Sequence, residues 1–413
     1  MNSYYDERET RTAHQRIEAL TSELLSLVTH AKTHAPAYAE LLKDVDTGAL
    51  SSLEDLASIP LTRKSVLMEL QSKAPPFGGL VADTGSSLKH IFVSPGPIFE
   101  PQVTRPNYWR MARALYAAGI RRGSVVHNSF SYHLTPAGAM LNSGCHALEA
   151  AVIPGGVGNT ELQLETIVQL KPDAYCGTPS FLAILIERAL ETGVDMHSID
   201  NALVSGEAFL PSQREQFLRH GISAVQCYAT ADVGLIAYES SVDSALIVDE
   251  DVYLEIVRPG TADPVPDGEV GEVVVTALNP DYPLIRFATG DLSAVLPGDS
   301  PCGRTNRRIK GWMGRADQTT KVRGMFVHPS QIDRIARRHP EVGRARLVIE
   351  YVNDSDSMML HCECDAGDVQ DGLSEAIAKS IRDLCKIRGE VSLVAPDSLP
   401  NDGIVIEDRR VYD

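Results

Sequence analysis

The stretch "IFVSPGPIFEP" at residues 91–101 has the residue types of a turn that could hold a phosphate group. An apolar run leads into a Gly/Pro turn, and phosphate sites of this kind use free backbone N–H groups, hydroxyl donors and a cation. Ser94 supplies a hydroxyl and Gly96 an unhindered backbone. Pro95 and Pro97 in the turn lack backbone N–H donors, and Glu100 brings a negative charge. The stretch is either a phosphate loop that has lost its phosphate-binding groups or a turn that never bound phosphate.

The run "HCEC" at residues 361–364 has metal-binding residue types. In a strand, alternate side chains point to opposite faces, so these four cannot converge on one ion. The sequence offers no second Cys/His cluster to complete a site. We therefore interpret this run as part of a core strand.

The composition limits the classes of partner. The chain has 413 residues, a length typical of two or three domains, and a net charge of −17. Nucleic acid and anionic membranes require concentrated Lys and Arg, so neither is expected as a partner, although a local basic pocket for an anionic ligand stays open. The sequence shows no signal-peptide pattern and no apolar stretch long enough to span a membrane. The seven scattered cysteines indicate reduced thiols, and we expect a cytoplasmic protein.

The elements that must position these residues follow a changing pattern. Leu20, Leu24 and their neighbours Ile17, Leu27 and Val28 recur at helical spacing and predict an N-terminal amphipathic helix. Residues 110–217 alternate apolar strands ("GSVVHNSF", "DAYCGT") with helices ("ELQLETIVQL", "PSFLAILIERAL"), which indicates a mostly parallel sheet.

After Gly234 the pattern changes. "VYLEIV" and "GEVVVTAL" flank a Pro-Asp-Gly turn and predict an antiparallel β region. From about Gly314 onward, strands and two helices ("PSQIDRIARRHP", "GLSEAIAKSIRDLCKI") predict a small α+β unit of roughly one hundred residues.

Four motifs in chain order now carry a resemblance to a known family. They are "CYATADVG" (227–234), "RFATGDL" (286–292), "GWMGRADQTTKVRGMFVHPSQID" (311–333) and "LPNDGIVIEDRR" (399–410). Together with "LTRKSVL" and "SGE", they resemble the phenylacetate–CoA ligase family of the adenylate-forming superfamily. The resemblance runs from about residue 15 to the end of the chain.

The resemblance implies an α/β fold with a large N-terminal domain, residues 1–315, and a small mobile α+β C-terminal domain, residues 316–413. It also implies ATP, Mg²⁺ and coenzyme A. A carboxylate attacks the α-phosphate of ATP to give an acyl-adenylate and pyrophosphate; the small domain rotates, and the CoA thiol then displaces AMP. This chemistry requires cations and N–H groups for the phosphates, a carboxylate for Mg²⁺ and an anchor for the ribose.

The resemblance also assigns roles to individual residues. It implies ribose contacts for Asp291 and Arg315, a hinge at Asp317 and a glycine, Gly324, facing the pantetheine tunnel. An ionised carboxylate suits two adjacent ribose hydroxyls. The further implied positions are, for the nucleotide, Ser94, Gly96, Ser205, Gly206, Glu207, Tyr228, Ala229 and Thr230; for Mg²⁺, Asp232; and for the acid, Tyr132 and His133. A core tyrosine at Tyr228 and a core histidine at His133 are the structural alternatives.

The chain departs from the family pattern in several places. Asp232 stands where a glutamate commonly holds Mg²⁺, and Ala231 replaces a hydroxyl. The stretch 91–101 overlays the family's Ser-Ser-Gly-Thr-Thr-Gly-Lys-Pro loop, but Glu100 occupies the lysine position. A like charge at about 4 Å and an effective dielectric near 20 costs on the order of 4 kcal/mol, so we expect Glu100 to point outward.

Ile404 occupies the position of the family's C-terminal catalytic lysine. An apolar side chain cannot stabilise developing charge, and losing one such donor typically costs roughly 10²–10³ in rate. Either the first half-reaction was lost naturally or a lysine-to-isoleucine change was introduced.

We therefore expect an ATP-dependent acid–CoA ligase for a carboxylic acid, which the family implies to be aromatic or similarly compact. Two alternatives stay open: adenylation with transfer to a carrier protein or amine, and a non-catalytic nucleotide- or acyl-CoA-binding protein. A homodimer is also left open.

Overall fold

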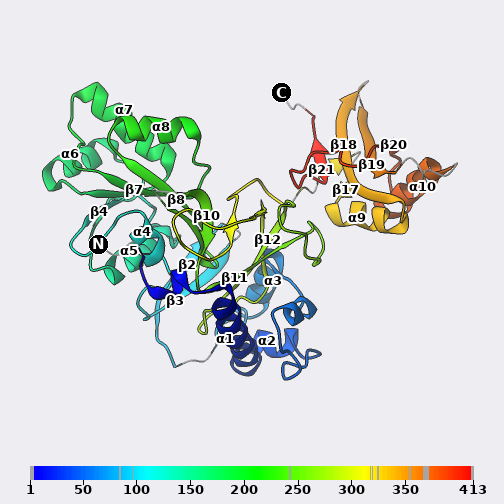
Figure 1. Ribbon diagram of the computed structural model, residues 1–413, viewed down its shortest axis with the longest axis horizontal. Coiled ribbons are helices and arrows are strands. Elements are labelled where there is room, and N and C mark those ends of the chain that lie inside the picture. The colour runs from blue at the N-terminus through cyan, green and yellow to red at the C-terminus, as the bar shows by residue number, and fades with distance from the viewer. Residues whose placement is uncertain are drawn as a thin grey trace. The chain divides into compact units, whose positions relative to one another are not determined.

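The computed structural model describes residues 4–82, 85–95, 97–240, 243–316, 318, 320–322, 325–352, 355–365 and 372–410 (Figure 1). The chain forms two compact units. Unit 1 comprises Met1–Leu254, Val274–Thr289 and Val295–Trp312; unit 2 comprises Glu255–Val273, Gly290–Ala294 and Met313–Asp413. Three of the predicted site residues, Gly96, Asp317 and Gly324, lie outside the described residues.

A parallel sheet forms the centre of unit 1, as the alternating pattern predicts. Its strands pair in the order β5-β4-β6-β7-β8, each parallel to its neighbour. The strands are β4 (Val125–Asn128), β5 (Ala151–Pro154), β6 (Ala174–Gly177), β7 (Asn201–Val204) and β8 (Ser223–Thr230). The connecting helices are α5 (Ala137–Ala147), α6 (Thr160–Leu170), α7 (Pro179–Thr192) and α8 (Pro211–Arg219).

Helices cover both faces of this sheet. On one face α6, α7 and α8 lie together (Figure 1), and Ile167, Leu185 and Phe217 pack there against Tyr175. On the other face α4 (Ala112–Ala117) and α5 pack against the sheet in a second core, through residues such as Leu115. The three layers bury both faces of the central strands β4, β6 and β7, which explains their largely apolar sequences, whereas the edge strand β5 is partly exposed.

Antiparallel strands extend this sheet and form separate smaller ones. After β8, the nine-stranded sheet continues through antiparallel β9 (Gly234–Ser240), β10 (Asp243–Val248), β15 (Arg308–Ile309) and β14 (Val295–Leu296). A second sheet has the order β1-β13-β12-β11, with β1 (Thr62–Arg63), β13 (Phe287–Ser293), β12 (Gly271–Ala277) and β11 (Val252–Val257). The strands predicted in this region are present, and β11 and β12 are neighbours. Strands β2 (Leu88–Ser94) and β3 (Ile98–Val103) form an antiparallel hairpin.

The predicted N-terminal helix is α1 (Ala13–His34), which begins with a capping box of Thr12 and Gln15. Its inward face carries Leu20, Leu24, Leu27 and Val28, as predicted. Ile17, in contrast, is 56% exposed. The preceding residue, Arg16, is buried and bonds to Glu250, so an ion pair occupies the inward side of the first turns. Two further helices follow, α2 (Pro36–Leu41) and α3 (Lys64–Lys73).

The C-terminal part of unit 2 is the predicted α+β fold. A four-stranded sheet has the order β20-β19-β18-β21, and α9 (Pro329–Arg338) and α10 (Leu373–Cys385) share a core with it. The strands are β18 (Val342–Val352), β19 (Ser355–Cys364), β20 (Glu390–Val394) and β21 (Ile406–Asp408), preceded by the pair β16 (Thr320–Val322) and β17 (Met325–Val327). Cys362 and Cys364 both face this core, as strand alternation predicts. No helix among the described residues is long and apolar enough to cross a membrane.

A buried ion network fastens the N-terminal segment of unit 1. Arg113 contacts Asp6 at 2.8 Å, Glu9 at 3.2 Å and Asp249 at 3.1 Å, and its side chain is only 5% exposed. Glu9 is fully buried and also pairs with Arg304 at 3.0 Å. Removing one partner of such a network leaves uncompensated buried charge, which is more costly than the pairing is favourable.

We predict that Arg113→Ala lowers the free energy of unfolding of unit 1 by about 3–5 kcal/mol, because three carboxylates lose their common cation. Urea denaturation followed by circular dichroism measures this change. The matched control is Arg122→Ala, since Arg122 is 82% exposed and pairs with Glu149 at the surface. Exposed pairs contribute about 0–1 kcal/mol. Equal effects of the two substitutions would contradict the assignment of the network.

Candidate active site

An apolar pocket in unit 1 brings together several of the predicted nucleotide-binding segments. It encloses about 580 Å³ and is lined in part by Ser94, by Ser205 and Gly206, and by Ala229 and Thr230. These residues come from the end of β2, the loop after β7 and the end of β8. Because β7 and β8 are parallel, their carboxyl ends lie at one edge of the sheet, where ligands bind in α/β folds.

The rest of the pocket wall is apolar except for Thr135. Besides Pro95 and Ala231, its apolar side chains are Met111, Phe130, Pro136, Ala137, Met140 and Leu141. Sequence reasoning missed all six, because an apolar helix face that lines a pocket has the same pattern as one that packs into a core. The first turn of α5 supplies three of these residues.

The structure does not bring Tyr132 and His133 to this pocket. The Tyr132 hydroxyl donates to Asn142 Oδ1 at 2.7 Å and lines a separate pocket, and His133 is exposed. The chain turns at Leu134, which has a positive φ of 60°, so that Thr135 to Ala137 line the apolar pocket instead.

Glu100 points inward, so the expectation that it faces outward is wrong. It is fully buried, and Ser94 Oγ donates a short hydrogen bond to its Oε1. The reason is strand register: Ile98, Glu100 and Gln102 alternate along β3 on one buried side of the hairpin. Burial, partly offset by the Ser94 hydrogen bond and reinforced by the charge of Asp232, raises the pKa of Glu100 to about 7.

Asp232 is buried and forms an ion pair with Lys64, whose Nζ lies 3.0 Å from Oδ2. Lys64 is the first residue of α3 and belongs to the "LTRKSVL" motif, to which sequence reasoning assigned no chemical role. The pair brings a cation to the carboxylate predicted to hold Mg²⁺. Lys64 thereby supplies a positive charge to a site whose loop, residues 91–101, contains no Lys or Arg.

The residues present fit a magnesium ion. Both carboxylate oxygens of Asp232 are buried; Oδ2 faces the Lys64 ammonium, and Oδ1 has no hydrogen-bond partner among the described residues. Hard oxygen ligands with free lone pairs are what Mg²⁺ prefers. Asp232 can therefore hold this ion.

The other predicted nucleotide residues are held by local contacts. Tyr228 donates from its hydroxyl to Thr289 Oγ1 at 3.1 Å, and Ser205 donates to the carbonyl of Cys227 at 2.8 Å. Glu207 accepts a hydrogen bond from the backbone of Ser180 at the start of α7, at 2.6 Å. It therefore caps that helix in this structure.

Asp291 and Arg315 are brought together in unit 2. Arg315 Nη1 donates to Asp291 Oδ1 at 2.8 Å, and the two residues also form an isolated backbone bridge. Gly290 has a φ of 75°, in the left-handed region that favours glycine, and a Cβ atom there would lie 2.6 Å from Arg315 Nη2 and displace that guanidinium. The predicted ribose pair thus exists as a unit.

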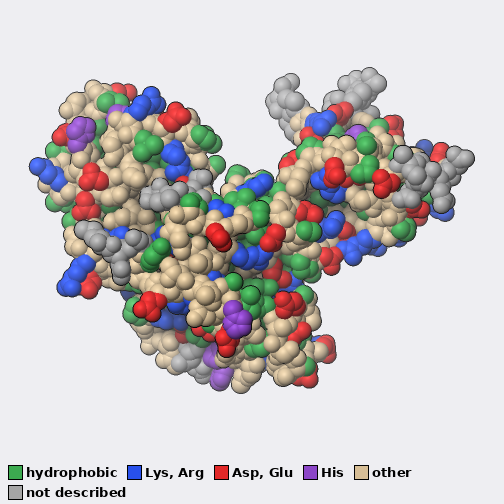
Figure 2. All heavy atoms as spheres, viewed as in Figure 1, with side chains coloured by type: hydrophobic (Ala, Val, Ile, Leu, Met, Phe, Trp, Pro, Cys, Tyr) green, Lys and Arg blue, Asp and Glu red, His purple; other side chains and the backbone are tan. Residues whose placement is uncertain are grey.

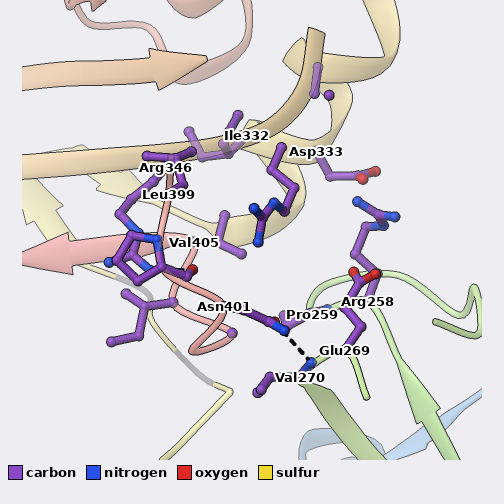
Figure 3. Close-up of a pocket in the computed structure, with 17 residues that line it drawn as sticks. Arg258, Pro259, Glu269, Val270, Ile332, Asp333, Arg346, Leu399, Asn401 and Val405 are labelled. Atoms are coloured by element: carbon purple, nitrogen blue, oxygen red, sulfur yellow. Dashed lines mark hydrogen bonds between the residues drawn. The ribbon is translucent and has the colours of Figure 1, made fainter. Parts of the chain in front are cut away.

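Ile404 is exposed and lines a different pocket, which lies within unit 2. Its backbone N–H donates to Asp402 Oδ1 at 3.0 Å. Figure 3 shows this pocket, in which Asn401 reaches toward Val270; the Val270 N–H donates to Asn401 Oδ1 at 3.3 Å. The side chain that the resemblance assigns to the family lysine position therefore lies at a pocket wall.

Comparison with known proteins identifies the class of this chain. Residues 324–413 match the family described as the AMP-binding enzyme C-terminal domain. A 2-hydroxyisobutyryl-CoA ligase in an open conformation, in complex with 2-HIB-AMP and CoA, superposes with a TM-score of 0.74 at 26% identity, covering 100% of this chain and 95% of that one. Fold and site together define an adenylate-forming enzyme.

The relatives define the family more narrowly. Phenylacetate-coenzyme A ligase of Thermus thermophilus is 30% identical over 96% of both chains. That of Pseudomonas putida is 31% identical over 81% of this chain and 78% of its own. The chain belongs to the phenylacetate–coenzyme A ligase family, whose members are AMP-forming acid–CoA ligases.

The buried Glu100 predicts a pH-dependent stability. Its folded-state pKa of about 7 lies above the ordinary 4.5, so its stabilising contribution is complete below about pH 4.5 and is lost as the pH rises through 7. For the metal-free protein in EDTA, Glu100→Gln should be up to about 3 kcal/mol more stable than the parent above pH 7 and similar near pH 5. Thermal unfolding between pH 5 and 8.5 measures this, with the exposed Glu165→Gln as control. A constant difference at all pH values would contradict titration of Glu100.

Proposed function

We propose that this protein joins a compact, largely apolar carboxylic acid, such as an aromatic acid, to coenzyme A through an acyl-adenylate formed from ATP. The observation that carries this proposal is the apolar pocket bounded by the predicted nucleotide-binding segments. Among the described residues that line it, none is charged. Such a wall favours an apolar acyl group and disfavours a second carboxylate, which would be buried without a partner.

In the proposed first half-reaction, a carboxylate oxygen of the acid bonds to the α-phosphorus of ATP, and pyrophosphate leaves. Lys64 and the Thr230 hydroxyl would meet the phosphates. Mg²⁺ held by Asp232 would neutralise phosphate charge when bound. We assign Asp291 and Arg315 to the ribose, and Ser205 to Glu207 with Tyr228 to the adenine side.

In the proposed second half-reaction, the CoA thiolate bonds to the acyl carbon and AMP leaves. We place the boundary of the mobile domain between residues 315 and 316, with Asp317 as its hinge and Gly324 beside the pantetheine arm. The related 2-hydroxyisobutyryl-CoA ligase is known in an open state and in a thioesterification state, which supports such an alternation.

The apolar side chain of Ile404 leads us to expect a slow first half-reaction. Without a cation at this position, negative charge that develops between the acid and the α-phosphate lacks one donor. A protein that binds nucleotide and acyl-CoA without turnover is therefore the second candidate. Transfer to a carrier protein or amine would show itself as turnover without stimulation by CoA.

The proposed partners are small molecules, in a cytoplasmic protein that binds neither nucleic acid nor membrane. The net charge of −17 supports this view. Figure 2 shows acidic and basic side chains interspersed over the visible face. A homodimer is compatible with the proposal.

Pyrophosphate release tests the proposed function directly. We expect Ile404→Lys to release pyrophosphate roughly 10²–10³ times faster than the parent chain with its preferred aryl or alkyl acid, because the lysine restores a charged donor. Ile404→Met, of similar size and uncharged, is the control and should leave the rate unchanged. If neither the parent nor Ile404→Lys releases pyrophosphate with any acid of a broad panel, with or without CoA, the ligase proposal fails.

The ribose assignment is tested by AMP binding. Asp291→Asn should raise the Kd for AMP about 10–100-fold in isothermal titration calorimetry, because hydrogen bonds to an ionised acceptor are worth about 1.5–3 kcal/mol. Asp299→Asn, at an exposed position nearby in sequence, provides the control. Unchanged AMP affinity in Asp291→Asn would remove Asp291 from the nucleotide site.

A further inference from the structure

Three buried side chains in unit 1 carry polar atoms that lack hydrogen-bond partners within the described part of the chain. Glu100 is 0% exposed, Tyr282 2% and Asp232 3%. The atoms are Glu100 Oε2, Asp232 Oδ1 and the Tyr282 hydroxyl, whereas Asp232 Oδ2 faces the Lys64 ammonium at 3.0 Å. Buried polar atoms are almost always hydrogen-bonded, and an unsatisfied one is costly. Three such atoms in one region therefore call for an occupant.

The three side chains share one electrostatic environment. Burial raises the pKa of Tyr282, and the charges of Asp232 and Glu100 raise it further. The charge of Asp232 also raises the pKa of Glu100. Geometry places Glu100 and Asp232 beside the same pocket, since Ser94, which bonds to Glu100, and Ala231, which precedes Asp232, both line it.

Neither the neighbouring lysine nor protonation satisfies this cluster. Lys64 lies 3.0 Å from Asp232 and can neutralise one carboxylate of the two. Ser94 already bonds to Glu100 Oε1. Oε2 lacks a donor among the described residues whether Glu100 is ionised or carries its proton on Oε1, toward Ser94. A positively charged ligand would occupy this lone pair.

We propose that Glu100 is a ligand of a divalent cation, which it holds together with Asp232 while the Tyr282 hydroxyl hydrogen-bonds a metal-bound water. Two carboxylates and water molecules form a hard oxygen site suited to Mg²⁺ or Mn²⁺. The resemblance aligns Glu100 with the lysine of the family loop, so a carboxylate ligand here departs from the family pattern.

The charge balance explains how the loop functions without its lysine. A lysine presents one positive charge; a glutamate with a divalent cation also sums to one positive charge. The loop would therefore offer a bound triphosphate the same net charge through a metal instead of an ammonium group. This consequence rests on the proposed function, whereas cation binding itself does not.

Mn²⁺ binding to the full chain without nucleotide, followed by electron paramagnetic resonance, tests the proposal. We expect one Mn²⁺ per chain, an at least 10-fold weaker Kd in Glu100→Gln and in Asp232→Asn, and no binding in Glu100→Lys. Glu165→Gln is the control for a lost surface carboxylate, and circular dichroism verifies that each variant is folded.

Two results would overturn the proposal: absence of Mn²⁺ binding by the parent chain, or equal Mn²⁺ affinity in the parent and a folded Glu100→Gln. In the first case, Asp232 would bind a cation only together with nucleotide. In the second case, Glu100 would be a buried carboxyl group without a role in cation binding. Mn²⁺ binding by the parent, with no pyrophosphate release by either the parent or Ile404→Lys, would retain the cation site and refute the ligase function. Pyrophosphate release without Mn²⁺ binding would retain the ligase function and refute the cation site.

Discussion

The parallel pairing of β6, β7 and β8 is the constraint on which the candidate site depends. Parallel strands must all end at the same edge of their sheet, so the loops that follow β7 and β8 meet there without any long-range contact of their own. The serine–glycine pair after β7 and the Ala–Thr–Ala run at the end of β8 are consequently neighbours in space. The hairpin of β2 and β3 and the first turn of α5 then close the remaining sides.

Two fully buried glutamates show how differently this fold uses a carboxylate. Glu9 receives Arg113, Arg304 and the Tyr238 hydroxyl, so its lone pairs are occupied and its role is to fasten the N-terminal segment. Glu100 receives only the Ser94 hydroxyl among the described residues. A protein gains no stability from leaving a buried oxygen without a partner, which is why such atoms mark sites of function more often than sites of structure.

Sequence reasoning succeeded where a local pattern determines the structure. The alternation of strands and helices in residues 110–217 and the C-terminal α+β fold follow from periodicity. It failed where packing decides. The direction of Glu100 depends on hairpin register, and the partner of Asp232 is Lys64, 168 residues earlier in the chain. Ile17 was predicted on the buried face because periodicity does not reveal that Arg16 reaches a buried acid.

The apolar pocket has a chemical consequence that follows from two of its residues. Met111 and Met140 contribute thioethers to a wall that otherwise holds Phe130, prolines, alanines and Leu141. Oxidation would convert each thioether into a polar sulfoxide and replace an adaptable apolar surface with one that repels an acyl group. A bound acid would shield both sulfur atoms from peroxide. The extent of sulfoxide formation at these two positions thus becomes a chemical record of whether the pocket was occupied.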